Sequence, residues 1–435
     1  MSTQLSAPIN RQSAEALARG NKEPDWLVQL RGDAAELIST LAWPKPEKMN
    51  IERWELSAVG SYQTSEAVSA VSALPEQIRG MISEKNKNVI VQRNSTNVFK
   101  ELSADLANKG VIFTDLETAV KEHGDLVKPY LFQAVAKDEN KFTALQAATW
   151  NGGVFLYVPR NVEVEVPLQA VLYNDNAEAA FAPHIIVVAE ANSRVTYVDT
   201  VLSEGAANES AFVHPSIVEI YAKPGSLVRF SSIRSMGAAG VDLSYRRAIA
   251  EDDARVEWII GDLNDGNTLS ETKTIMKGRG STSDTKVISI GKDSQKMSIT
   301  AHAVHFGKHS DSNMIIRAVM KDSASAIING ITKIEHGATK ANGVQTERVL
   351  MLSPKARGDA NPILLIDEDD VTAGHAASAG QVNPEQVYYL MSRGISKQQA
   401  EKLIINGFLA PEVAEIAVEA VRQQLVRLLE RKLER

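Results

Sequence analysis

The middle of the chain is a series of short runs rich in β-branched and aromatic residues. Val162, Val164 and Val166 alternate with polar residues before Pro167, a pattern typical of a strand. Similar runs cover residues 185–188, 195–198, 217–221, 228–230, 256–260 and 286–290. No long helical period separates these runs, so this stretch of about 200 residues predicts a β-sandwich, a β-barrel or a β-solenoid.

A weak internal repeat favours the solenoid. Three segments share a small residue, a valine two positions later and an aromatic residue two positions after that: 193–197, 226–230 and 254–258. They begin 33 and 28 residues apart, and each follows a turn-like pair of residues. In a stack of coils, the equivalent valines would form one ladder that points inward. Taken alone, the repeat does not exclude another β fold in which the same pattern recurs by chance.

Both ends of the chain have helical patterns. Between residues 24 and 41, apolar residues recur at three- and four-residue spacing, which indicates an amphipathic helix. A second helix is predicted between a capping box at residues 114–117 and a stop at Gly124.

The C-terminal helices have clear start and stop signals. Asn383 caps a helix that should end at Gly394, and Ser396 caps a second helix that should stop at Gly407. Pro411 should open a third helix, which has one continuous apolar stripe. Such a unit suits the docking of a partner, although it would equally cap the open end of the β core.

These patterns divide the chain into three predicted parts. Residues 1–150 form a mostly helical N-terminal region, residues 151–372 form the β core, and residues 373–435 form a C-terminal helical domain. The content of 44% hydrophobic and 23% charged residues is that of an ordinary globular protein. A core of normal size can therefore form without disulfides or structural metal.

Charge and cysteine content exclude several function classes. The net charge of −7 argues against a general nucleic-acid binder, which would carry a basic surplus. The chain has no cysteine, so it can form no disulfide, no thiolate metal site and no cysteine-ligated cluster of its own. Residues 1–19 lack the apolar run of a signal peptide, and no window approaches a membrane span. We expect a cytoplasmic protein with no membrane contact.

Three histidines form the most obvious candidate metal site. His302, His305 and His309 would share one face of a helix, but their neighbourhood reads as strand and turn. On a strand, His302 and His309 would face together and His305 would lie opposite. Polar positions satisfied by hydrogen bonds on a solenoid wall are therefore favoured over a metal site.

Nucleotide and hydrolase motifs are missing. The glycines at 278–280 and 307 do not complete a P-loop, so this chain should not bind ATP by itself. The chain contains no G-x-S-x-G nucleophile elbow. His375 stands among small residues at 370–380, a segment expected to join the β core to the helices, where an accessible imidazole could ligate metal or move protons.

Five pieces of sequence follow one another in a specific order and spacing. They are Asn-Pro-Ile-Leu-Leu-Ile at 361–366, Asp-Val at 370–371, Gly-His-Ala at 374–376, Val-Tyr-Tyr-Leu-Met-Ser-Arg-Gly-Ile at 387–395 and Gly-Phe at 407–408. This series resembles the C-terminal signature of the SufB/SufD family of iron–sulfur cluster assembly proteins. Weaker similarity at residues 43–54, 145–159, 329–330 and 345–353 extends the resemblance over most of the chain.

The resemblance implies a fold and a set of partners. Members of the family have a right-handed parallel β-helix, a β-solenoid, between helical end domains, in agreement with the mainly β pattern described above. The chain resembles SufD more than SufB, because it has no cysteine and SufB needs cysteine to take up sulfur. The implied function is a non-catalytic scaffold subunit of the SUF complex. A SufB-like subunit would pair with its β-helix, and a SufC-like ABC ATPase would dock on its C-terminal helices.

The resemblance also implies which residues act. His375 matches the histidine that SufD contributes where the cluster forms, which makes it the candidate interface residue and a tentative metal ligand. Other SufD members often have a cysteine two residues earlier, and this chain has Ala373 there. The candidate partner-binding residues are Tyr388, Tyr389, Arg393, Gly394 and Phe408. No cofactor would stay bound to this chain alone: the iron–sulfur cluster is transient, and ATP binds only to the partner.

Two other hypotheses stay open. The first is a stand-alone β-helix enzyme, which would need a carboxylate cluster and usually an aromatic cleft, although aromatic residues make up only 6% of this chain. The second is a purely structural subunit in which His375 is only a packed polar residue. An isolated β-helix with an open edge is also expected to be able to form a homodimer.

Overall fold

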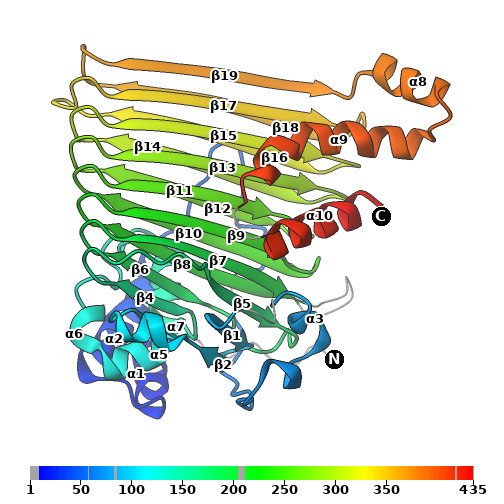
Figure 1. The fold of residues 1–435 in the computed structure, drawn as a ribbon. Helices are drawn as coiled ribbons and strands as arrows, with labels where there is room; N and C mark the ends of the chain where they lie inside the picture. Colours follow the sequence, from blue (N-terminus) through cyan, green and yellow to red (C-terminus); the bar gives the residue numbers. More distant parts are fainter. Residues whose placement is uncertain (1–8, 57, 83–85, 204–210, 417–418, 435) are drawn as a thin grey trace.

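The computed structural model describes residues 9–56, 58–82, 86–203, 211–416 and 419–434. Its centre is a β-solenoid of about 8 turns in which consecutive strands alternate between two sheets (Figure 1). This architecture confirms the predicted fold class, with helices at both ends of the chain.

The first sheet has ten strands and the second has nine. In stacking order, the first sheet contains β19 (Thr372–Gln381), β17 (Asn342–Met351), β15 (Asp311–Met320), β13 (Thr282–Gly291), β11 (Arg255–Asp262), β9 (Leu227–Ser235), β7 (Arg194–Ser203), β5 (Leu168–Asn174), β1 (Val89–Arg93) and β2 (Thr96–Glu101). The second contains β18 (Arg357–Ile366), β16 (Ser325–Ile334), β14 (Lys296–His305), β12 (Thr268–Met276), β10 (Gly240–Ala250), β8 (Phe212–Ala222), β6 (His184–Ala189), β4 (Val154–Val158) and β3 (Ile112–Thr114). All pairings among strands β4 to β19 are parallel.

The repeat in the sequence is the inward ladder of this solenoid. Val195, Val228 and Val256 are in register on β7, β9 and β11, and all three are buried. The aromatic residues two positions later stack in the same order: the ring centroids of Tyr197 and Phe230 lie 5.1 Å apart. The next coil continues the ladder with Trp258. Because each coil buries its apolar face only against its neighbours, register is fixed along the whole stack.

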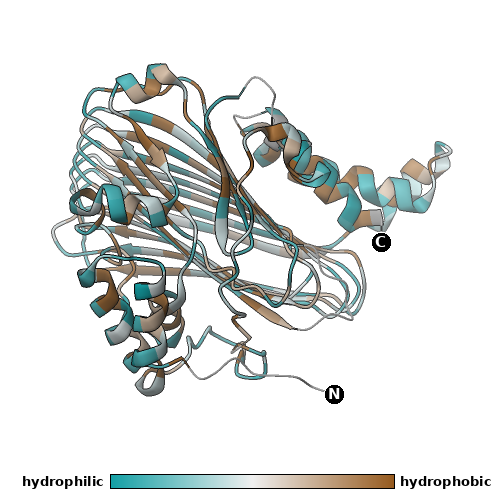
Figure 2. Cartoon of the chain, turned by 90° about the horizontal axis from the view of Figure 1, so that it is seen from below, coloured by the Kyte–Doolittle hydropathy of each residue, from teal (hydrophilic) through white to brown (hydrophobic). Residues whose placement is uncertain are grey.

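Helices cover the outer face of each sheet. The N-terminal helices are α1 (Arg11–Gly20), α2 (Asp25–Thr40), α3 (Glu76–Arg79), α4 (Ala104–Asn108), α5 (Leu116–Glu122), α6 (Gly124–Val127) and α7 (Lys141–Thr149), with a 3-10 turn η1 (Val71–Ala73). Five of them, α1, α2, α5, α6 and α7, share a hydrophobic cluster with the outer face of the second sheet. The C-terminal helices are α8 (Pro384–Ser392), α9 (Lys397–Ala414) and α10 (Glu419–Glu434). Of these, α9 and α10 pack on the outer face of the first sheet, on another side of the stack (Figure 2).

Several predicted helices are confirmed, two of them with the predicted cap. The predicted helix at 24–41 is α2, and the helix predicted between residues 114 and 124 is α5. The capping box predicted at 114–117 is wrong, because the N-cap is Asp115, which accepts a hydrogen bond from the Thr118 N–H. Asn383 caps α8, and Ser396 forms a capping box at the start of α9. These signals are local, so tertiary context does not change them.

Other predictions are wrong. Residues 161–166 form no strand and make only one isolated bridge, Glu163 with Arg194, because they turn the corner between β4 and β5. The second C-terminal helix does not stop at Gly407: α9 continues through Pro411 to Ala414. The buried stripe of Ile405, Leu409 and Val413 holds this helix on the first sheet, and that packing outweighs the lost hydrogen bond at the proline.

Two boundaries differ from the simple three-part division. Residues 1–150 also contribute β1, β2 and β3, and β1 pairs with β5 of the solenoid. At the other end, the expected boundary at 372/373 falls inside β19. Among the described residues, no helix combines the length and the apolar character needed to cross a membrane.

Candidate functional site

His375 lies on β19, the outermost strand of the stack (Figure 1). The expected linker at 370–380 is wrong, because β19 pairs with β17 over its whole length. A parallel ladder uses backbone groups alone, so even a strand of alanine, glycine and serine can pair with the edge that β17 offers. Among the described residues, β19 is the last strand of this sheet, and the His375 side chain is exposed.

His375 ends a column of side chains that face the interior. Trp258, Thr285, Met314, Gln345 and His375 are in register on consecutive strands of the first sheet. Residues in register on parallel strands leave the sheet on the same face, and Trp258 and Met314 belong to the interior core. The imidazole is therefore on the interior-lining face at the open end of the solenoid.

The interior becomes polar beneath this end. Gln345 is fully buried and accepts a hydrogen bond of 2.9 Å from the Thr332 hydroxyl. Its amide nitrogen donates to the Ile363 carbonyl at 3.4 Å. One coil lower, the matching positions are apolar residues of the core, Met314 and Ile316. At these two positions the last coils therefore carry hydrogen-bonding groups where the coil below carries apolar side chains.

Glu347 is the most unusual member of this polar end. Its side chain is 0% exposed, and neither carboxylate oxygen has a hydrogen-bond partner among the described residues. Burial raises the pKa of Glu347 to about 7. A methyl group at Gly330, on the opposite wall, would stand 1.8 Å from Glu347 Oε1, so the glycine leaves the space that the carboxylate fills.

The three histidines predicted as a candidate metal site are not brought together as one. His305 faces the interior, where its two ring nitrogens contact the hydroxyls of Ser310 and Ser312 at 2.9 and 2.8 Å. His302 lies on the other face of β14, and burial lowers its pKa to about 3. His309 occupies a turn with φ of 57°, so it does not pair with His302 as a strand would require. The described residues contain no group of three His, Cys, Asp or Glu side chains able to hold a metal ion.

The predicted docking residues fall into two groups. Tyr388 and Tyr389 on α8 are 74% and 57% exposed, and the Arg393 guanidinium lies 5.3 Å from the Tyr389 ring centroid. Gly394 ends the helix with φ of 85°. Phe408 is instead partly buried, and its ring lies 5.2 Å from the guanidinium carbon of Arg317 on β15. Phe408 therefore anchors α9 to the solenoid, while the tyrosines face solvent.

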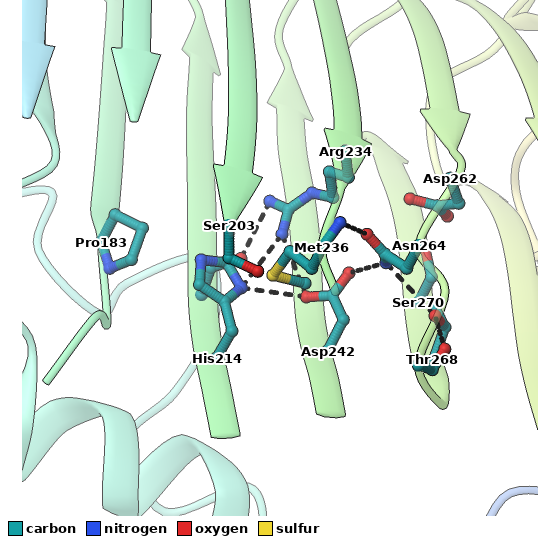
Figure 3. A network of polar contacts seen from close by, with 12 residues as sticks. Pro183, Ser203, His214, Arg234, Met236, Asp242, Asp262, Asn264, Thr268 and Ser270 are labelled. Carbon is teal, nitrogen blue, oxygen red and sulfur yellow. Dashed lines mark hydrogen bonds and ion pairs between the residues drawn. The ribbon is translucent and has the colours of Figure 1, made fainter. Parts of the chain in front are cut away.

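A second polar region lies deep inside the solenoid and was not predicted from the sequence (Figure 3). Arg234 on β9 reaches across the interior and donates to Asp242 at 3.1 Å and to Ser216 at 2.9 Å. His214 lies 3.0 Å from the same Asp242 oxygen, and Asn264 donates to the other at 2.9 Å. All of these side chains are buried.

Burial and neighbouring charges together shift the pKa values of the side chains in this region. Burial raises the pKa of Asp242, but Arg234 and His214 lower it more, so it lies below its ordinary value. Burial also lowers the pKa of His214. Asp199, at the edge of the same region, has its pKa raised to about 6 by burial and accepts a hydrogen bond from Ser232. Arg234, Asp242 and His214 thus compensate one another within the chain.

The sequence did contain a signal for the polar end. Within each strand, the residues two apart that face inward are apolar in most coils, as in Met314, Ile316 and Ala318. The same positions on β17 are Gln345, Glu347 and Val349. A polar pair that follows apolar residues at the same inward positions is detectable once the coils are aligned, but aligning them requires the observed register.

Comparison with known proteins gives a consistent result over the whole chain. Residues 21–170 match the family model described as the SufBD protein N-terminal region, and residues 171–408 match the SUF system FeS cluster assembly SufBD core domain. The chain is 45% identical to the iron-sulfur cluster assembly protein SufD of Bacillus subtilis, covering 100% of this chain and 99% of that protein. It is 26% identical to SufB of the same organism, covering 94% and 90%. A SufBD family protein of Staphylococcus haemolyticus is 26% identical, covering 93% and 88%.

Proposed function

The chain belongs to the SufBD family of the SUF iron–sulfur cluster assembly system, and on that premise we propose that it is the SufD-type scaffold subunit of an assembly complex. It pairs with a SufB-type subunit, docks a SufC-type ATPase and takes no catalytic part of its own. No cofactor stays bound to it; the cluster forms transiently at the interface with the SufB-type subunit, and ATP binds only to the ATPase.

The position of His375 is the observation that carries this proposal. Its strand, β19, leaves one edge of backbone hydrogen-bonding groups free at the end of the stack, and an open edge is a template for a strand of another chain. The imidazole is exposed on that strand and faces the mouth of the interior. A partner placed over β19 would therefore cover His375, and iron held there would be shielded from water.

The C-terminal helices support the docking of a second partner. Tyr388 and Tyr389 present two large exposed aromatic rings beside Arg393, and exposed aromatic and arginine side chains are the types that dominate protein interfaces. Since α8 directly follows β19, a movement of a partner on α8 would be transmitted to the strand that carries His375.

Co-expression tests the proposal directly. This chain, carrying a tag, is expressed with SufB-type and SufC-type subunits from the same source, and the mass and stoichiometry of the purified material are measured. We expect one copy of this chain with one SufB-type and two SufC-type subunits. A lone monomer or homodimer that retains no SufC-type subunit would refute the scaffold assignment. H375A is expected to leave the complex intact and to abolish cluster assembly, whereas unchanged assembly would support a purely structural subunit.

A further inference from the structure

A buried carboxylate without partners needs a physical explanation. An ionised carboxylate that accepts no hydrogen bond is unfavourable in a protein interior, and native proteins retain very few of them. Glu347 has no hydrogen-bond partner on either oxygen among the described residues, and no ion pair compensates its charge there. The sequence even provides room for it, since only a glycine at 330 avoids a collision with Oε1.

The location of Glu347 separates it from ordinary core residues. It lies on β17, and its neighbour in register on β19 is Ala377, whose side chain is small and exposed. In the part of the first sheet that the structure describes, β19 is the one strand beyond β17 toward the open end. His375 lies two residues before Ala377 on the same face of the same strand.

The spacing of the two residues suits a shared metal ion. Neighbouring strands lie about 4.8 Å apart and two residues span about 6.6 Å, so the two Cα atoms are about 8 Å apart on one face of the sheet. A glutamate and a histidine each extend several ångströms from the backbone, and metal–ligand distances of about 2 Å close the remaining gap. Imidazole together with carboxylate is a common ligand combination for ferrous iron.

We propose that Glu347 is an iron ligand, and that Glu347 and His375 together hold ferrous iron at the open end of the solenoid. This inference rests on the proposed role of the chain in cluster assembly. Bound Fe²⁺ would supply the charge compensation that the described residues do not give this carboxylate. Gln345, whose Oε1 also approaches Gly330, adds an amide oxygen to the same corner. The remaining ligands come from the partner over β19.

Direct binding of ferrous iron is the test. Fe²⁺ is titrated anaerobically into the purified complex of this chain with its SufB-type and SufC-type subunits, and the affinity is measured for wild type, E347Q, H375A and the double variant. We expect E347Q to lower the affinity at least about tenfold, and the double variant to fall by less than the sum of the two single effects, because both remove one site.

A matched control exists in the same interior column. Asp199, Ser232, Ile260, Val287, Ile316 and Glu347 are in register on consecutive strands. D199N makes the same carboxylate-to-amide change deep in the stack and should leave the Fe²⁺ affinity unchanged. E347D keeps a carboxylate and should retain more affinity than E347Q; it also serves if E347Q prevents assembly.

The outcomes separate the inference from the proposed function. If E347Q binds Fe²⁺ like wild type while H375A binds weakly, Glu347 is not a ligand and the inference fails, although the scaffold role stands. If neither variant changes the affinity, the iron site lies elsewhere and the inference fails together with the role of His375. If no complex forms with the SufB-type and SufC-type subunits, the proposed function fails first.

Discussion

Two buried glutamates, at opposite regions of the solenoid, have opposite surroundings. Glu219 on β8 lies beneath the N-terminal helices, and Glu347 on β17 lies beneath the open end; both are 0% exposed. The Glu219 carboxylate accepts hydrogen bonds from the N–H groups of residues 132, 134 and 135, from the Tyr221 hydroxyl, and contacts His184 Nε2 at 2.9 Å. The Glu347 carboxylate accepts none from the described residues.

The difference shows how a buried charge can be assigned to structure or to binding. Glu219 joins the loop at 130–135 to the second sheet, and both of its oxygens accept hydrogen bonds, so its role is complete within the chain. Glu347 lacks such donors, and burial raises its pKa, which is characteristic of groups kept for a ligand. The same substitution, glutamate to glutamine, should therefore have opposite effects on stability at the two sites.

The largest expected effect is the loss of stability in E219Q. The amide cannot accept from the three backbone N–H groups and the Tyr221 hydroxyl at once, because its own N–H₂ group would face some of these donors and leave them unsatisfied. We expect the free energy of unfolding to fall by about 3 kcal/mol, measured by urea denaturation of the purified chain. A loss below about 1 kcal/mol would contradict the role given to Glu219.

E347Q should instead stabilise the isolated chain by about 2 kcal/mol at pH 8. The pKa of Glu347 is raised to about 7 in the folded chain from an ordinary value of 4.5. The folded state then holds the proton more tightly than the unfolded state, so wild type loses stability as pH rises from about 4.5 to about 7. The gain in E347Q should accordingly disappear near pH 4.5. Equal stability of E347Q and wild type at pH 8 would mean that the carboxylate is compensated within the chain.

The variant G330A tests the surroundings of Glu347 through a smaller effect on stability. Its methyl group would collide with Glu347 Oε1, and the side chain must move away from the second sheet. We expect a loss of about 1 kcal/mol in wild type and almost none in the E347A background, since removal of the carboxylate makes room. Equal losses in both backgrounds would show that the glycine serves the backbone instead.

The smallest effect on stability is expected for H375A. The imidazole is exposed and makes no hydrogen bond with the described residues that would be lost, so urea denaturation should give a value within about 0.5 kcal/mol of wild type. A loss above about 1 kcal/mol would show that His375 is a packed structural residue.

Much of the fold was accessible from the sequence. The small–valine–aromatic repeat predicted the inward ladder through Val195, Val228 and Val256 because each coil repeats the same burial. The caps at Asn383 and Ser396 fixed helix starts through contacts within a few residues. The prediction that a new helix opens at Pro411 is wrong, because the effect of this proline on α9 depends on packing against a sheet distant in sequence.

The candidate site divides in the same way. The sequence alone determined that His375 belongs to a family signature and that no cysteine in this chain can hold a cluster, because both facts are composition and order. Only the tertiary structure decided that His375 lies on a paired strand, that its column faces inward and that Glu347 lies beside it without a partner. Stacking brings together residues about one coil apart, and the cost of burying a charge depends on every neighbour that the stack supplies.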